Sequence, residues 1–323
     1  MSVTFSHAEA LEQIKTLLQA RYIFPETAQQ MNTLLDSRLP AYTAIEDPAS
    51  FANAVTEDLQ SISHDKHLYF RYDPANAGLI LMRKDEADIT AEWQELGREN
   101  YGFSRVEWLR GGIGYFDLRL FAPTFLAGDL AVAAMNFFAN VKALIIDLRK
   151  NGGGEPEMVQ LIASYLFSAE LQHLNSIYVR HEDKYTHYWT LPYVPGKRLP
   201  DIDVYILTSR HTYSGGEDLA YNLQALGRAT VIGETTGGAA NPGDFHAVSG
   251  VFTLFVPDGR PISPITQTNW EGTGVTPDIQ VPADEALKVA HRMALEKCIE
   301  RAEQAADDTE RKRLQKALST LAE

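Results

Sequence analysis

Cysteine is almost absent from this sequence, because Cys298 is the only one among 323 residues. A single cysteine excludes an intrachain disulfide. Cys298 lies in a run with helical character, residues 286–306, where a small sulfur-containing side chain is typical of a packed position. We therefore expect a packing residue there rather than a nucleophile.

Long apolar runs and a leader pattern are also missing. No stretch approaches the roughly eighteen apolar residues that indicate a membrane-spanning helix. Residues 1–9 contain neither the basic segment nor the apolar segment of a signal peptide. These absences predict a cytoplasmic protein without a membrane span.

Basic residues are scarce relative to acidic ones. Lys and Arg number 29 against 43 Asp and Glu, which gives a net charge of −14. This balance argues against a nucleic-acid-binding surface and gives no sign of a membrane-binding patch. The G-x-G-x-x-G spacing of dinucleotide sites and the Gly-Lys-Ser/Thr ending of phosphate loops are both missing. The sequence therefore implies no nucleotide cofactor, and it implies no metal.

Apolar periodicity divides the chain into four consecutive segments. Three helices predict an N-terminal helical domain over residues 1–75, and a polar connecting segment with one helix at 91–96 follows over 76–104. Strands and helices alternate in a core over residues 105–283, before a helical segment over 284–323. This alternation indicates an α/β fold. Strands are predicted at residues 68–72, 105–109, 113–118, 143–148, 174–179, 185–191, 204–207, 230–234 and 251–256.

The first notable turn of the core follows an almost continuously apolar strand at residues 143–148. It contains Gly152, Gly153 and Gly154 and leads into a helix predicted at residues 156–167. Three glycines at the carboxyl end of a buried strand allow backbone N–H groups to approach an anion closely. We expect an anion-binding turn here.

A second turn places Ser214 between the strand at residues 204–207 and a helix that contains Leu219 and Leu223. A serine at a strand-to-helix turn exposes its hydroxyl and sets the N–H of Gly215 beside it, where it can hold an oxyanion. The simpler alternative is a helix cap, since Ser214 followed by Glu217 forms a capping box. The turn alone leaves both interpretations open.

Histidine supplies the candidate bases. His64 and His67 precede the strand at residues 68–72, and a turn that enters a strand is poor ground for a shared metal. A histidine at such a junction can act as a base, although a histidine without a function is the commoner case. His246, expected in a loop after the Gly-rich residues 235–243, is a weaker candidate.

Three segments together resemble the tail-specific (C-terminal-processing) serine peptidase family. They are residues 145–154, residues 208–220 with 228–238, and residues 270–279. Relatives of this family include the tricorn core peptidase and the repeated modules of the interphotoreceptor retinoid-binding protein, and the N-terminal helices followed by residues 58–68 also resemble one such module. The resemblance covers nearly the whole chain and implies a crotonase-like core, a spiral of ββα units, with a helical domain beside it.

The resemblance also implies roles for individual residues. One branch of the family pairs its serine with a lysine, but Gly238 stands at the lysine position and no lysine occurs between Lys197 and Lys288. The tricorn-like branch uses serine, an upstream histidine and a downstream glutamate, which match Ser214, His67 and Glu271.

In that branch the Gly-rich turn and the residue after the serine supply the oxyanion donors, here Gly153 or Gly154 together with Gly215. Many processing peptidases carry an inserted peptide-binding domain. The stretch between Tyr72 and Arg105 is too short for a compact domain of about 90 residues.

A serine peptidase that cleaves peptides near their C-termini is the function that these residues favour. An imidazole that titrates near neutral pH can accept the serine proton, and a carboxylate can fix its tautomer. The carboxylate would raise the imidazole pKa and burial would lower it. Two alternatives stay open: a noncatalytic carrier of a hydrophobic, retinoid-like or fatty-acid-like ligand, and hydrolysis of an ester or thioester by the same triad.

Overall fold

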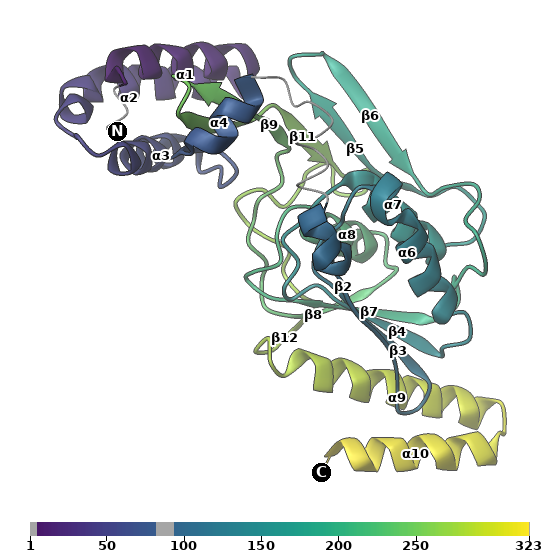
Figure 1. Cartoon of the computed structure of the whole chain (residues 1–323). Coiled ribbons are helices and arrows are strands. Elements are labelled where there is room, and N and C mark those ends of the chain that lie inside the picture. Colours follow the sequence, from purple (N-terminus) through teal and green to yellow (C-terminus); the bar gives the residue numbers. More distant parts are fainter. Residues whose placement is uncertain (1–4, 82–93, 323) are drawn as a thin grey trace. The chain divides into compact units, whose positions relative to one another are not determined.

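The computed structural model describes residues 5–81 and 94–322, which form two compact units that interleave along the sequence (Figure 1). The first unit contains the described part of Met1–Gln94 with Ser176–Thr186 and Ala239–Ile262. The second contains the remaining described residues, from Glu95 onward. The division into segments 1–75, 76–104, 105–283 and 284–323 stays a prediction.

Two helices of the first unit, α1 and α3, begin at side-chain caps. Ser6 caps α1 by accepting the N–H of Glu9 at 3.3 Å, and Asp47 caps α3 by accepting the N–H of Ser50 at 2.7 Å. A proline stands at the start of α2 and of α3, where no N–H partner is needed. The helices of this unit are α1 (His7–Arg21), α2 (Pro25–Thr43), α3 (Pro48–Ser63) and α4 (Pro74–Leu81).

The first unit also contains an antiparallel sheet. The sequence predicted a helical domain at the N-terminus and did not predict this sheet. Its order is β1-β10-β9, so β10 is the central strand and pairs with β1 on one side and with β9 on the other. Phe70 lies opposite Leu254, and His246 lies opposite Leu254 from the other side. The strands are β1 (Tyr69–Tyr72), β9 (Gly243–Val248) and β10 (Phe252–Pro257). The loop predicted around His246 is therefore wrong, because the pairing with β10 makes this segment a strand.

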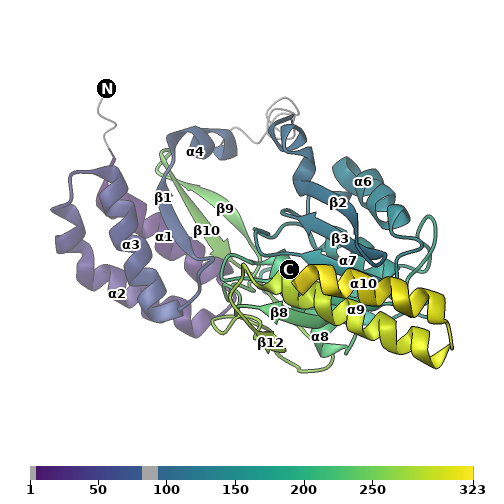
Figure 2. The same cartoon turned by 90° about the horizontal axis from the view of Figure 1, so that it is seen from below.

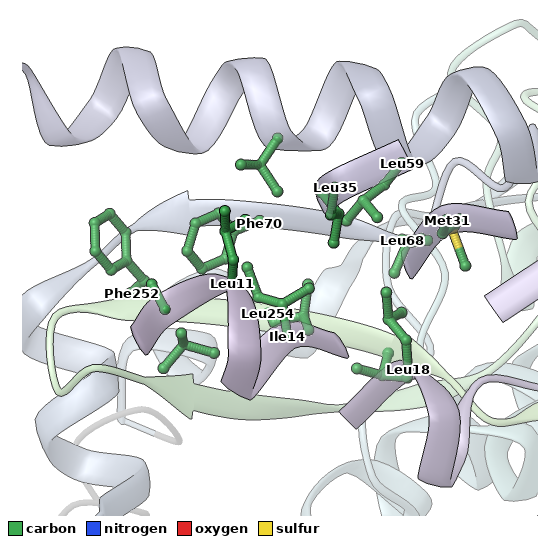
Figure 3. Close-up of a cluster of buried hydrophobic side chains, with 14 of the residues drawn as sticks. Leu11, Ile14, Leu18, Met31, Leu35, Leu59, Leu68, Phe70, Phe252 and Leu254 are labelled. Carbon is green, nitrogen blue, oxygen red and sulfur yellow. The ribbon is translucent and has the colours of Figure 1, made fainter. Parts of the chain in front are cut away.

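One hydrophobic core joins helices α1, α2 and α3 to one face of this sheet (Figures 2 and 3). The apolar residues of α1 recur at helical spacing, so they share one face of the helix. Alternate residues of β1 and β10 point to the same side, as the pleat of a strand requires. The fully buried members include Ile14, Leu18, Met31, Leu35, Phe51, Leu59, Phe70, Phe252 and Leu254.

A second three-stranded sheet has the order β11-β5-β6. Its strands are β5 (His173–Val179), β6 (Lys184–Trp189) and β11 (Gly259–Ile262). The strands predicted at residues 174–179 and 185–191 are thus present with slightly different ends, whereas β11 was not predicted.

The second unit is built on a six-stranded mixed sheet with the order β12-β8-β7-β4-β3-β2. All neighbours run parallel except β2 and β3, which form an antiparallel pair. The strands are β2 (Phe103–Leu109), β3 (Ile113–Leu118), β4 (Ala143–Asp147), β7 (Asp203–Thr208), β8 (Thr230–Gly233) and β12 (Ile279–Gln280).

Helices cover both faces of this sheet (Figure 1). Helices α6 (Thr124–Phe137), α7 (Pro156–Tyr165) and α8 (Gly215–Ala225) lie on one face, and α9 (Ala286–Gln304) and α10 (Asp308–Ala322) lie on the other. Burial on both faces explains why β4 and β7 read as continuous apolar runs. Cys298 lies on α9 and is buried in the core that this layer shares with the sheet, as expected of a packing residue. The sheet residues that face this layer are Ile113, Tyr115, Ala143, Ile145, Tyr205, Leu207 and Ile232.

The overall α/β prediction is confirmed, with helices at both ends of the chain. Residues 91–93 of the helix predicted at 91–96 lie outside the described residues, and residues 94–96 are helical as predicted. Among the described residues no helix is long and apolar enough to cross a membrane.

Two adjacent phenylalanines at the end of α6 test the packing of the second unit. Phe138 is fully buried against Phe116 and Gly114, whereas Phe137 is 51% exposed. Phe138→Ala should lower the free energy of unfolding by about 3–5 kcal/mol, because it leaves a cavity. Phe137→Ala should cost under about 1 kcal/mol. Urea unfolding of both variants measures the difference, and equal costs would contradict this packing.

Candidate active site

Ser214 stands at the turn between β7 and α8, as the sequence predicts. It is the N-cap of α8 and has φ +48° and ψ −117°, a backbone conformation that is rare for a residue with a side chain. Such strain persists only where surrounding contacts hold it, and it concentrates at functional sites. Ser214 is partly exposed.

Glu217 provides one of the contacts that hold this turn. One of its carboxylate oxygens accepts the N–H of Ser214 at 2.9 Å. The other accepts the hydroxyl of Thr236 at 2.5 Å and the N–H of Gly238 at 2.6 Å. The capping box that the sequence indicated is thus present, with the Ser214 side chain accepting the N–H of Glu217 in return. A hydroxyl that accepts a hydrogen bond can still donate its proton to a base.

The Gly-rich turn after β4 is held by a buried side chain that the sequence analysis did not single out. Asn151 is fully buried, donates its Nδ2 to the carbonyl of Leu118 at 2.9 Å and accepts the N–H of Gly153 at 2.8 Å. Its own carbonyl accepts the N–H of Tyr213 at 3.0 Å, which ties this turn to the residue before Ser214. An asparagine beside a Gly-rich turn is the signal that could have identified it.

The two turns touch each other directly. A Cβ placed on Gly153 would lie 2.7 Å from the Cβ of Ser214, and one placed on Gly215 would lie 2.9 Å from the carbonyl oxygen of Gly154. Gly153 and Gly154 also have φ values of +105° and +123°. Both the spacing and the backbone conformation therefore require glycine at these positions.

The N–H groups around this contact differ in what they bind. The N–H of Gly153 already donates to Asn151. Within the part of the chain that the structure describes, the N–H groups of Gly154 and Gly215 have no hydrogen-bond acceptor. These two are the donors that remain for a negatively charged group beside Ser214.

Glu271 lies in the loop before β12, in the same unit as Ser214. The preceding Trp270 is 2% exposed and packs against the ring of Tyr221 on α8, with ring centroids 5.3 Å apart. The following Gly272 donates its N–H to the carbonyl of Gly238 at 3.0 Å. This loop is therefore fixed to α8 and to the loop after β8.

His67 belongs to the first unit, in the turn between α3 and β1. The exposed His64 ends α3 in a left-handed conformation, with φ +54°. Asp65 then accepts the N–H of His67 at 3.0 Å, the amide of Asn241 at 3.0 Å and the hydroxyl of Tyr22 at 3.4 Å. The backbone of His67 is thus held by a buried carboxyl group.

Burial determines the charge state of this pair. It lowers the pKa of His67 to about 4, so the imidazole is neutral near pH 7. It also raises the pKa of Asp65, against the hydrogen bonds that this carboxyl accepts. A neutral imidazole is the form that can accept a proton.

The structure therefore brings Ser214, Gly153, Gly154 and Gly215 together in the second unit, where the loop of Glu271 is also fixed. His67 lies in the first unit and remains a predicted partner of Ser214. His246 lies on β9 in the first unit, where burial lowers its pKa.

A pair of glycine variants tests the turn without reference to activity. Gly154→Ala would place a Cβ 2.2 Å from the carbonyl oxygen of Phe121 at a φ of +123°. It should therefore cost at least about 2 kcal/mol of stability. Gly152→Ala meets nothing within 4 Å and should change stability by under about 1 kcal/mol. Urea unfolding checks both, and a tolerated Gly154→Ala would contradict the turn geometry.

Sequence comparison identifies both parts of the chain. The profile of peptidase family S41 matches residues 112–281. A second profile, the N-terminal domain of peptidase S41 in eukaryotic IRBP, matches residues 3–103.

Solved structures share the fold at low sequence identity. The photosystem II D1 C-terminal processing protease is 13% identical, with a TM-score of 0.54 over 87% of this chain and 94% of its own. A putative peptidase from Parabacteroides merdae is 19% identical, with a TM-score of 0.59 over 90% and 98%. Mature CPAF complexed with lactacystin is 10% identical, with a TM-score of 0.59 over 97% and 99%.

The first profile alone spans more than half of the chain and contains both turns and the Glu271 loop. The chain belongs to peptidase family S41 and is a serine peptidase, a hydrolase whose substrates are peptides or proteins.

Proposed function

We propose that this peptidase cleaves peptide bonds with Ser214 as nucleophile, His67 as general base and Glu271 as the carboxylate that orients the imidazole. The observation that carries the proposal is the contact between the strained Ser214 turn and the Gly-rich turn, with two unused N–H groups beside it. Nucleophile and oxyanion donors must meet in this way for acyl transfer.

In the proposed reaction Ser214 attacks the scissile carbonyl carbon while its proton passes to His67. The carbonyl oxygen gains the negative charge and is stabilised by the N–H groups of Gly154 and Gly215. His67 then returns the proton to the leaving amine as the carbon–nitrogen bond breaks, and water releases the acyl group by the same steps. Gly153 contributes space for the close approach, because its own N–H is bound to Asn151.

Other expectations belong to the same proposal. The parallel strands of the second unit, with helices between them, support a crotonase-like ββα spiral. Cleavage near substrate C-termini is supported by the fold shared with the D1 C-terminal processing protease. The IRBP-type N-terminal profile is the one observation that favours a hydrophobic-ligand carrier as a second candidate.

Removal of the proposed nucleophile distinguishes a peptidase from a carrier of hydrophobic ligands. Ser214→Ala should lower peptidase activity by at least about 10³-fold, because acyl transfer loses its nucleophile. Stability should fall by no more than about 1 kcal/mol, the value of a helix cap. Peptide and ester substrates, together with fluorophosphonate labelling, provide the measurement.

Ser37→Ala, on an exposed face of α2, is the control and should keep full activity. Activity that survives in Ser214→Ala would contradict the assignment of the nucleophile. Binding of a retinoid or fatty acid by a protein that labels with no fluorophosphonate and cleaves no substrate would favour the carrier.

The pH dependence of kcat/KM tests the base. His67 must be neutral to accept the proton, so activity should be full above its pKa and lost as pH falls through it. Burial lowers this pKa to about 4, so the acidic limb should lie below the ordinary value of about 6.5. Glu271→Gln removes a carboxylate that stabilises the imidazolium, so this variant should be slower and its limb should move to still lower pH.

The free energy of unfolding should also depend on the protonation of His67. Because the pKa of His67 is lower in the folded than in the unfolded state, its contribution is complete above about pH 6.5 and decreases as pH falls toward about 4. His67→Gln should lack this component. A limb that does not move in Glu271→Gln, at an unchanged rate, would remove Glu271 from the proposed mechanism.

A further inference from the structure

We infer that Glu217 is a positioning residue for the reaction: its buried carboxylate fixes the Ser214 turn and aligns it with the loop that carries Glu271. The inference rests on the proposed role of Ser214 as nucleophile. It assigns to Glu217 no contact with the substrate.

The geometry of Glu217 suits a carboxylate that accepts hydrogen bonds at both oxygens. Its side chain is fully buried in the first turn of α8, and its two oxygens accept from three donors at 2.5–2.9 Å. The donors are the N–H of Ser214, the hydroxyl of Thr236 and the N–H of Gly238. A carboxylate only accepts hydrogen bonds, whereas an amide would place an NH₂ group against at least one donor. Glutamine, the amide of the same length, therefore leaves at least one of these donors without an acceptor.

The contact to Ser214 bears directly on the orientation of the nucleophile. A φ of +48° is unfavourable for serine and would relax without an external constraint. The hydrogen bond from the Ser214 N–H to Glu217 fixes the peptide plane before the Ser214 Cα. The direction of the side chain is thereby constrained, as attack on a carbonyl carbon requires.

The other carboxylate oxygen connects the turn to the Glu271 loop. The Thr236 hydroxyl that donates to Glu217 also accepts the N–H of Val275 at 2.6 Å. Gly238 donates its N–H to Glu217 and accepts the N–H of Gly272 with its carbonyl at 3.0 Å. Glu271 lies between Trp270 and Gly272, so one carboxylate links the nucleophile to the loop of the proposed triad acid.

A helix cap alone does not account for these contacts. A capping box uses one oxygen of the acidic residue, for the N–H of the cap residue. Here the second oxygen binds a loop that is 19 and 21 residues away in sequence. Thr236 is itself buried, so without Glu217 its hydroxyl would lose the acceptor of its hydrogen bond.

The neighbouring Asp218 offers a matched control. It is also a buried carboxyl group in the first turn of α8, but its side chain accepts from Asn175 at 2.5 Å and Asn222 at 2.8 Å. Among the described residues its carboxyl group makes no hydrogen bond to the Ser214 turn, and only its backbone N–H donates to the Ser214 carbonyl, at 2.9 Å. Asp218→Asn and Glu217→Gln thus make the same chemical change at adjacent buried positions.

The experiment compares these two variants with the wild type and with Ser214→Ala. For Glu217→Gln we expect kcat and the rate of fluorophosphonate labelling to fall about 10- to 100-fold, with KM changed less than about threefold, because the nucleophile is misaligned while the substrate contacts remain. Asp218→Asn should stay within about threefold of the wild type in kcat. Thermal unfolding of both variants shows whether their folded populations match.

Equal kcat values for folded Glu217→Gln and Asp218→Asn would overturn the inference. If Glu217→Gln does not fold, Thr236→Val decides, since it removes one of the three donors and keeps the side-chain shape. A fall of about tenfold in kcat supports the inference, and an unchanged kcat contradicts it. Activity that persists in Ser214→Ala would instead be a failure of the proposed nucleophile, and the two failures remain distinguishable.

Discussion

The parallel pairing of β4 with β7 is the constraint on which the rest of the site depends. Asp147 pairs with Leu207 at the carboxyl ends of these strands, so the turns that follow begin side by side. Ligand sites of open α/β sheets form at this edge for the same reason. The contact between Gly153 and Ser214 then requires glycine, because any Cβ on Gly153 would enter the volume of Ser214. The register of β4 and β7 thus determines which backbone N–H groups lie beside Ser214.

Much of this arrangement was predictable from local patterns in the sequence. The apolar runs predicted β4 and β7, and the glycines and Ser214 indicated both turns. The helices of the first unit followed from apolar periodicity. These features depend on neighbouring residues, so the sequence carries them in short segments.

The remaining features depend on pairings between distant residues. Strand β9 exists because it pairs with β10, and the alternation that would reveal it is interrupted by Gly243 and Asp244. The use of the Gly153 N–H by Asn151 is a matter of side-chain orientation, which spacing alone does not determine. The low pKa of His67 results from burial by residues far away in the chain. Such long-range effects override local preference.

A crystal structure of the fluorophosphonate adduct tests the central claim most directly. The adduct has a tetrahedral phosphorus with an oxygen in the place of the proposed oxyanion. We expect the phosphorus on Ser214 Oγ, its oxygen about 2.7–3.1 Å from the N–H groups of Gly154 and Gly215, and the His67 ring within about 3.2 Å of Ser214 Oγ. An adduct on another residue, or an oxygen that points away from both N–H groups, would contradict the account.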